Sequence, residues 1–158
     1  SGIDVAVHGS VPTSFGEFSL SVAHTHVFDH KFRQYPGDAS INKLAATSGY
    51  YIPRDKSTAS ITWAVEGLKW TLEGRRLGKL PNYDENAYIK ASYLFNSTLQ
   101  YDFTDHLRGS LSVTNLLDRK PVKDRTYAAY PNYDISWFDS VGRSMFMQLT
   151  YKLGGSAL

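Results

Sequence analysis

Strict two-residue alternation of apolar and polar side chains is the feature that most constrains this chain. It recurs along the sequence, whereas no helical periodicity of any length is present. For example, Ile61 and Trp63 alternate with Ser60 and Thr62. Because successive side chains of a strand point to opposite faces, this pattern predicts strands with one apolar and one polar face. The predicted strands cover 3–11, 17–29, 58–66, about 69–79, 87–103, 107–116 and 143–153.

The connections between these strands alternate in length. Short turns lie at 12–16, 67–68 and 104–106. Longer loops lie at 30–57, about 80–86 and 117–142. An outer-membrane barrel has short turns on the periplasmic side and long loops outside, and its tilted strands need ~9–11 residues to cross the hydrocarbon. We therefore predict an all-β fold in which residues 1–153 form part of an antiparallel up-and-down transmembrane β-barrel, followed by a tail over 154–158.

The distribution of charge supports the membrane interpretation. In the middle of each run the apolar face carries almost no ionised group, as expected where a Lys or Arg would cost ~2–4 kcal/mol. Arg76 and Arg143 break this pattern near the long loops, where they would reach lipid headgroups. His24 and His26 also fall on the apolar face, and a β-bulge in that strand would turn them inward.

An odd number of strands, starting outside and ending in the periplasm, does not complete a bacterial barrel, which has an even number. It would also leave unpaired strand edges in lipid. We therefore expect further strands, from the same chain or from a separate one.

Composition excludes several other classes of protein. The chain has no Cys, which excludes disulfides and Cys-ligated metals. The net charge is only +2 and the basic residues are scattered, so no nucleic-acid partner is expected. The sequence contains no evident nucleophile signature, phosphate loop or glycosidase carboxylate pair, so we expect no enzymatic activity and no cofactor.

Three stretches resemble the TonB-dependent outer-membrane receptor family. Residues 111–121, LSVTNLLDRKP, match the pattern V-x-N-L-[FL]-D-x-x-P of the penultimate strand and its exit. Residues 142–153, GRSMFMQLTYKL, match the last strand, although Leu153 stands where the family usually has Phe. The opening SGID is similar to the start of an earlier strand.

This resemblance implies the C-terminal strands of a barrel of about 22 strands, the size of the plugged transporters. It further implies a receptor in the bacterial outer membrane, in contact with lipid and lipopolysaccharide. Such a receptor imports a scarce large ligand of the siderophore-iron, oligosaccharide or cobalamin type. Its partners would be the rest of the barrel, a plug domain, and the inner-membrane TonB complex reached through an N-terminal part that this sequence does not include.

Aromatic residues in the loops are the candidate ligand contacts, because such rings stack on sugars and on flat ligands. The alternative is that they pack on neighbouring loops and at the membrane interface. The candidates are Tyr127, Tyr130, Tyr133 and Trp137 in the loop 117–142, and Tyr50, Tyr51 and Arg54 in the loop 30–57.

Two further groups have mainly structural interpretations. Aromatic residues near the short turns predict a membrane-interface girdle, which stabilises a barrel. They are Trp63, Trp70, Tyr101, Phe103 and Tyr151. His24 and His26 share a strand face, as two metal ligands must, but spacing fixes no third ligand, so we predict no metal site.

Two other functions remain open. A passive, porin-like barrel would share the strand pattern but would need no plug. A soluble carbohydrate-binding β-sandwich would account for the Tyr- and Trp-rich loops.

Overall fold

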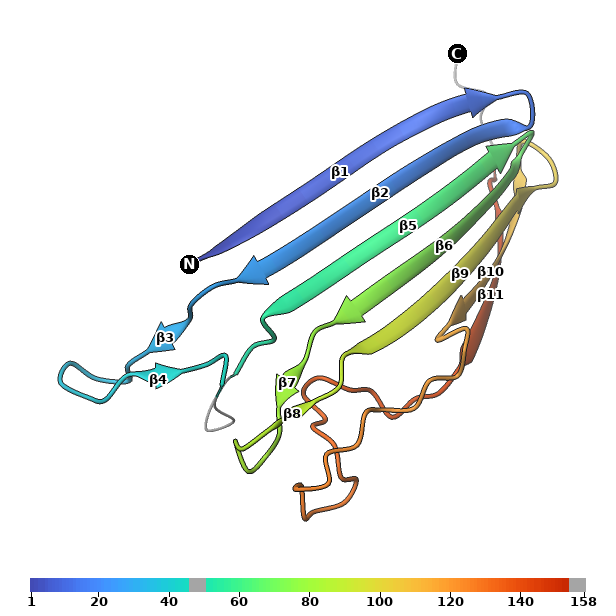
Figure 1. The fold of residues 1–158 in the computed structure, drawn as a ribbon. Helices are drawn as coiled ribbons and strands as arrows, with labels where there is room; N and C mark the ends of the chain where they lie inside the picture. The colour runs from blue at the N-terminus through green and yellow to red at the C-terminus, as the bar shows by residue number, and fades with distance from the viewer. Residues whose placement is uncertain (46–50, 154–158) are drawn as a thin grey trace.

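The chain folds into one antiparallel sheet, in which neighbouring strands follow one another in chain order (Figure 1). The computed structural model describes residues 1–45 and 51–153. The sheet strands are β1 Gly2–Thr13, β2 Gly16–Val27, β5 Asp55–Val65, β6 Leu68–Leu77, β9 Ser92–Asp102, β10 Leu107–Thr114 and β11 Ser144–Tyr151. Their order, β1-β2-β5-β6-β9-β10-β11, is that of an up-and-down meander. The predicted all-β antiparallel fold is confirmed.

Two small hairpins extend from the long-loop end of this sheet. In the first, β3 (Lys31–Phe32) pairs with β4 (Ile41–Asn42). In the second, β7 (Leu80–Pro81) pairs with β8 (Tyr88–Ile89). The predicted strand over 87–103 is therefore wrong at its start, because Tyr88 and Ile89 pair with β7 and the sheet strand begins only at Ser92.

The short connections are tight hairpin turns. Glu66 and Gly67 both have positive φ, 47° and 85°, which is the backbone that a two-residue turn between twisted strands requires. At the β1–β2 turn, the backbone N–H of Phe15 donates to Thr13 Oγ1 over 3.2 Å. Gly16 closes this turn with φ 115°, and a Cβ there would lie 2.3 Å from the carbonyl oxygen of Ala64. Glycine is therefore required at position 16.

The register of β2 is continuous on both sides. Val22 faces Val7 of β1 and Ala59 of β5, and the one-to-one pairing holds from Glu17 to His26. A bulge is therefore absent from β2, and the possibility that one turns the histidines inward is wrong. His24 and His26 lie on the same face as Val22, because the side-chain period of a strand is two.

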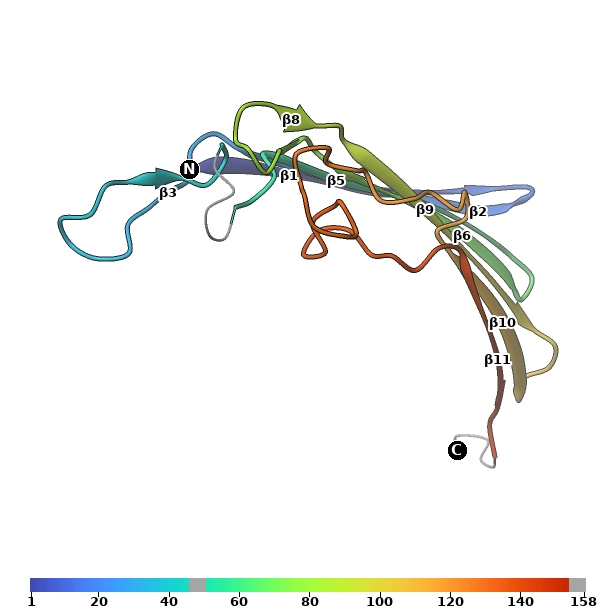
Figure 2. The same cartoon turned by 90° about the horizontal axis from the view of Figure 1, so that it is seen from below.

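The sheet is curved, and its two faces differ. The apolar face carries side chains such as Leu20, Ile61 and Leu99, which the registers place side by side. The loop between β10 and β11 lies on the concave side of the sheet (Figure 2). Its Trp137 contacts Lys56, which shares the polar face with Thr25 and Arg75. The concave side is therefore the polar face.

Hydrophobic burial is confined to the loops. In the described residues the buried hydrophobic side chains are Leu44, Leu80, Tyr133 and Phe138, and all four lie outside the seven-stranded sheet. The apolar face is open instead, with Met147 78% exposed and Val7 62% exposed. A β-sandwich buries the inner faces of two packed sheets. The one-layer sheet over 1–45 and 51–153 therefore contradicts the sandwich alternative. No helix in these ranges is long and apolar enough to cross a membrane.

Candidate ligand-binding site

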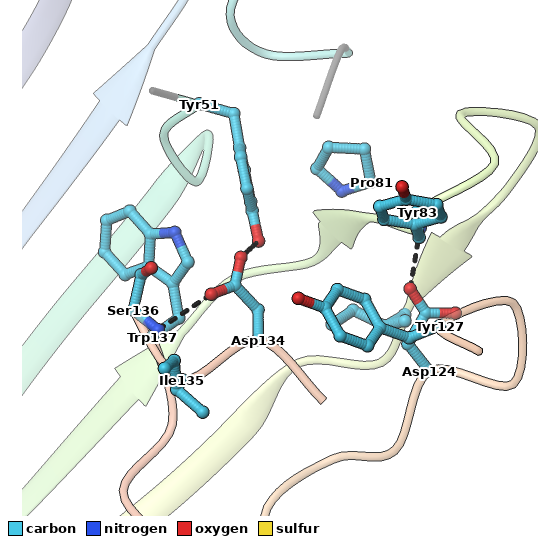
Figure 3. Close-up of a pocket in the computed structure, with 10 residues that line it drawn as sticks. Tyr51, Pro81, Tyr83, Asp124, Tyr127, Asp134, Ile135, Ser136 and Trp137 are labelled. Carbon is cyan, nitrogen blue, oxygen red and sulfur yellow. Dashed lines mark hydrogen bonds between the residues drawn. The ribbon is translucent and has the colours of Figure 1, made fainter. Parts of the chain in front are cut away.

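Three segments meet at the long-loop end of the sheet and enclose a cavity of about 570 Å³ (Figure 3). Tyr51 comes from the segment before β5, Tyr83 from the β7–β8 hairpin, and Tyr127 and Trp137 from the connection 115–143. Its volume lies within the ~300–1,000 Å³ range of small-molecule sites. The remaining lining residues are Pro81, Ile89, Asp124, Asp134, Ile135 and Ser136.

Asp134 holds one side of this cavity together. The Tyr51 hydroxyl donates a hydrogen bond to Asp134 Oδ2, and the backbone N–H of Ser136 donates to Asp134 Oδ1 over 2.7 Å. The rings of Tyr51 and Trp137 lie 6.2 Å apart between their centroids. Burial, followed by the adjacent Asp134 carboxylate, raises the pKa of the Tyr51 phenol far above its usual range. Tyr51 therefore remains a neutral hydrogen-bond donor at physiological pH.

Asp124 holds the opposite side. It accepts hydrogen bonds from the backbone N–H of Tyr83 over 2.7 Å and from the Thr126 hydroxyl over 2.7 Å. Burial acts to raise the pKa of this carboxyl, but the hydrogen bonds from Thr126 and Tyr83 outweigh it and hold the pKa below the usual range. The ionised Asp124 therefore ties the β7–β8 hairpin to the 115–143 connection. As a result, the Tyr83 and Tyr127 rings meet edge to face at 5.1 Å.

The cavity is suited to stacking. Four aromatic rings line it, and none of its lining residues is Lys or Arg. The two carboxylates already accept hydrogen bonds from the protein, so their main effect is to fix the rings in place. Preorganised rings offer large contact area at a small entropic cost.

A second cavity of about 550 Å³ lies between the 115–143 connection and the strands below it. Trp137 and Phe138 contribute from the connection, and Trp137 also lines the first cavity. Basic side chains are prominent in its lining, with Asp139 as the acidic lining residue. Glu73 and Asp118 offset part of this charge through ion pairs with Arg75 (3.5 Å) and Lys120 (3.4 Å). The basic residues that line it from the polar side are Lys56, Arg75, Arg119 and Lys120, whereas Arg76 lies on the apolar face, where its guanidinium donates to the Tyr93 hydroxyl.

The structure separates the residues that the sequence suggested as ligand contacts. Tyr51, Tyr127 and Trp137 converge on the first cavity. Tyr133 is only 9% exposed and packs with Leu80 and Phe138 in the loop core, whereas Tyr130 is 93% exposed and outside the cavity lining.

The two remaining candidates lie elsewhere. The Arg54 guanidinium donates to the carbonyl oxygens of Val27 and Phe28, 3.5 Å away in each case, at the end of β2. Tyr50 falls outside the described residues.

Tyr83 is the aromatic lining residue that the sequence did not suggest. It lies in the predicted loop 80–86, the shortest of the three long-side loops, where it is the single aromatic residue. Its position between two Tyr-rich loops at the same end of the sheet was the available signal.

The residues predicted to form a girdle lie at the short-turn end. Trp63 pairs with Trp70 across β5 and β6, and Trp63 Nε1 donates to the Phe15 carbonyl of the β1–β2 turn over 2.8 Å. Tyr101 and Phe103 meet edge to face at 5.0 Å. Tyr151 lies opposite Leu107, at the same end of β10. Their role at a membrane interface stays a prediction.

The seven-stranded antiparallel sheet resembles part of the wall of a β-barrel. A solved structure with this arrangement is a mutant of the ferric enterobactin receptor of Pseudomonas aeruginosa, with a TM-score of 0.64 and 18% sequence identity. The match covers 95% of this chain and 22% of the receptor, so the chain spans about a fifth of that receptor's length. At this identity the similarity establishes the fold and supports a distant relationship. No protein-family model and no curated protein matches the sequence.

Proposed function

We propose that this chain forms part of the wall and mouth of a TonB-dependent transporter in the bacterial outer membrane. The observation that carries the proposal is the one-layer sheet with an exposed apolar face and a polar face that is covered at its loop end. Acyl chains would cover the apolar face, because lipid-exposed positions of a barrel alternate with lumen positions along each strand. The polar face would line the lumen.

The outer loops would capture the ligand. Rings of the first cavity would stack on it, and the cations of the second cavity would attract negative charge towards the lumen. Of the siderophore-iron, oligosaccharide and cobalamin classes, this combination favours an anionic ligand that carries rings, such as a ferric siderophore. The ferric enterobactin receptor, to which the chain is structurally similar, supports the same choice.

The mechanism would consist of binding and gating, without a chemical step. Ligand bound at the mouth would be released inward when a plug domain is remodelled by the TonB complex. The remaining strands and the plug would be the partners of this chain within the outer membrane, together with lipid and lipopolysaccharide. A passive porin-like barrel is the alternative, and energy dependence distinguishes the two.

Uptake by the complete outer-membrane protein tests this proposal. The protein is expressed in a Gram-negative host that lacks its own receptors, with and without functional TonB. The probes are ferric enterobactin, cobalamin and maltohexaose, each radiolabelled. We expect accumulation of ferric enterobactin only where TonB is functional. Accumulation that is independent of TonB would establish the porin alternative, and TonB-dependent uptake of another probe would correct the ligand class.

Substitutions in the first cavity test the site itself. Tyr83→Ala and Tyr127→Ala should each raise the half-saturating ligand concentration by roughly tenfold, which corresponds to the loss of one stacking contact. Tyr35→Ala is the matched control, because Tyr35 is an exposed tyrosine of the β3–β4 hairpin outside both cavities. Equal affinity in all three variants would remove this cavity from the proposal.

A further inference from the structure

His24, His26 and Asp55 gather where β2 and β5 stop pairing. Asp55 lies directly opposite His26 in the register, and Ser57 lies opposite His24. All four residues share the apolar face. One ligand atom from each of His24, His26 and Asp55 lies within 4.8 Å of the others. Sequence spacing suggested His24 and His26 as ligands but no third. The pairing of β2 with β5 brings Asp55, from the far side of the connection 28–54, next to them.

We propose that these three residues bind a divalent transition-metal ion, with Zn²⁺ as the reference ion. Two imidazoles and one carboxylate form a donor set that zinc adopts when a water or another molecule completes a tetrahedron. Imidazole nitrogen suits Zn²⁺, Cu²⁺ and Ni²⁺, whereas Ca²⁺ and Mg²⁺ prefer sites built from oxygen. The donor set therefore selects the borderline metals.

The distances are close to those that a tetrahedral ion needs. Asp55 Oδ1 lies 3.8 Å from His24 Nε2 and 2.6 Å from His26 Nδ1. With metal–ligand bonds of ~2.0–2.1 Å, neighbouring donor atoms lie roughly 3.3 Å apart. The pair of His24 and Asp55 must therefore close slightly, and the hydrogen bond between His26 and Asp55 must open by less than an ångström. The third pair of donors, on His24 and His26, lies within 4.8 Å.

Neighbouring groups orient both imidazoles. His24 Nδ1 lies 2.8 Å from Ser57 Oγ, and in the tautomer that donates this hydrogen bond Nε2 presents its lone pair towards Asp55. An orienting partner of this kind is typical of metal-binding histidines. The His26 ring packs edge to face against Phe28 at 4.9 Å. The side chains of His24, His26 and Asp55 are 42%, 31% and 27% exposed, at the long-loop end of the apolar face.

The location gives such an ion a structural effect. The pair of His26 and Asp55 is the last of the β2–β5 ladder, just before the chain departs into the connection 28–54. A metal bound there would join the two strands at the base of that connection. This inference is independent of the transported ligand, because the cluster lies on the face opposite to the 115–143 connection.

Zinc titration of the complete, detergent-purified and metal-stripped protein tests the proposal. The variants are His24→Ala, Asp55→Asn and Ser57→Ala. The control is His8→Ala, which removes a histidine from the polar face of β1. By isothermal titration calorimetry, we expect His24→Ala and Asp55→Asn each to bind one equivalent of Zn²⁺ fewer than the wild type. Ser57→Ala should retain the site with about tenfold weaker affinity, and His8→Ala should match the wild type.

Cobalt supplies a second readout that does not depend on stoichiometry. Co²⁺ bound by the cluster should give visible absorption bands that His24→Gln abolishes and His8→Ala retains. The heat-dependent gel mobility typical of folded barrels identifies variants that have folded. Unchanged zinc binding in folded His24→Ala, or no saturable binding by the wild type, would overturn the proposal.

Discussion

Lys56 Nζ lies 4.8 Å from the centre of the Trp137 ring, so a side chain of β5 supports the connection that covers the polar face. A cation–π contact at a partly exposed site contributes ~0.5–1 kcal/mol. Lys56→Ala should therefore loosen residues 115–143 and leave the sheet intact. Limited proteolysis should show faster cleavage within this connection. Lys69→Ala is the control, because it removes a lysine from the other end of the polar face. Identical cleavage rates would contradict a supporting role for Lys56.

The Tyr51 hydroxyl gives a prediction for pH dependence. Because burial and Asp134 raise its pKa, the neutral phenol is the form that the folded protein stabilises. Its contribution is fully present below pH ~10, the ordinary value for tyrosine, and is lost only as the pH rises through the higher folded-state pKa. The ultraviolet absorbance titrations of wild type and Tyr51→Phe should therefore coincide through pH ~10 and separate only as the pH approaches the higher folded-state pKa of Tyr51. A difference that titrates near pH 10 would show that Tyr51 is not held by Asp134.

Substitutions of Ile61 and Ser60 test which face of the sheet contacts lipid. They are adjacent on β5 and point to opposite faces of the sheet. In the complete protein folded into lipid vesicles, Ile61→Arg should lower the free energy of unfolding by ~2–4 kcal/mol if that position lies near the bilayer midplane. Ser60→Arg should change it by about 0.5 kcal/mol or less. Urea unfolding followed by tryptophan fluorescence measures both, and equal losses would contradict the proposed orientation.

Substitution of Trp63 tests whether the aromatic residues at the short-turn end stabilise the sheet. Trp63→Phe retains a ring but removes the N–H that donates to the Phe15 carbonyl, which should cost about 0.5–1.5 kcal/mol of stability. Phe15→Leu is the matched control, because it changes the side chain of the turn and keeps the carbonyl acceptor. The same urea experiment measures both variants. An undiminished stability in Trp63→Phe would mean that this hydrogen bond does not contribute.

Most of the seven-stranded sheet could be predicted from the sequence, because an alternating pattern is a local property. The polar neighbours of Ile61 and Trp63 along the chain are enough to assign these two side chains to the apolar face. Gly67 indicates a turn because glycine readily adopts positive φ. The two hairpins in the loops could not be found in this way. Their strands are only two residues long, and such a segment carries no periodicity.

The sites depend on contacts that are distant in sequence. Tyr51 meets Asp134 and Tyr83 meets Asp124 only because three loops fold towards one another, which no spacing within a single loop reveals. Asp55 reaches His26 through a strand register that is set on the far side of a long connection. Where a pattern repeats along one segment the sequence was sufficient, and where two segments must meet it was not.

The confinement of hydrophobic burial to the loops makes the molecule modular. Leu80, Tyr133 and Phe138 pack with one another at the long-loop end, while backbone hydrogen bonds hold the seven-stranded sheet. Substitutions within this loop core can therefore alter the loops while the backbone hydrogen bonds of the sheet stay intact.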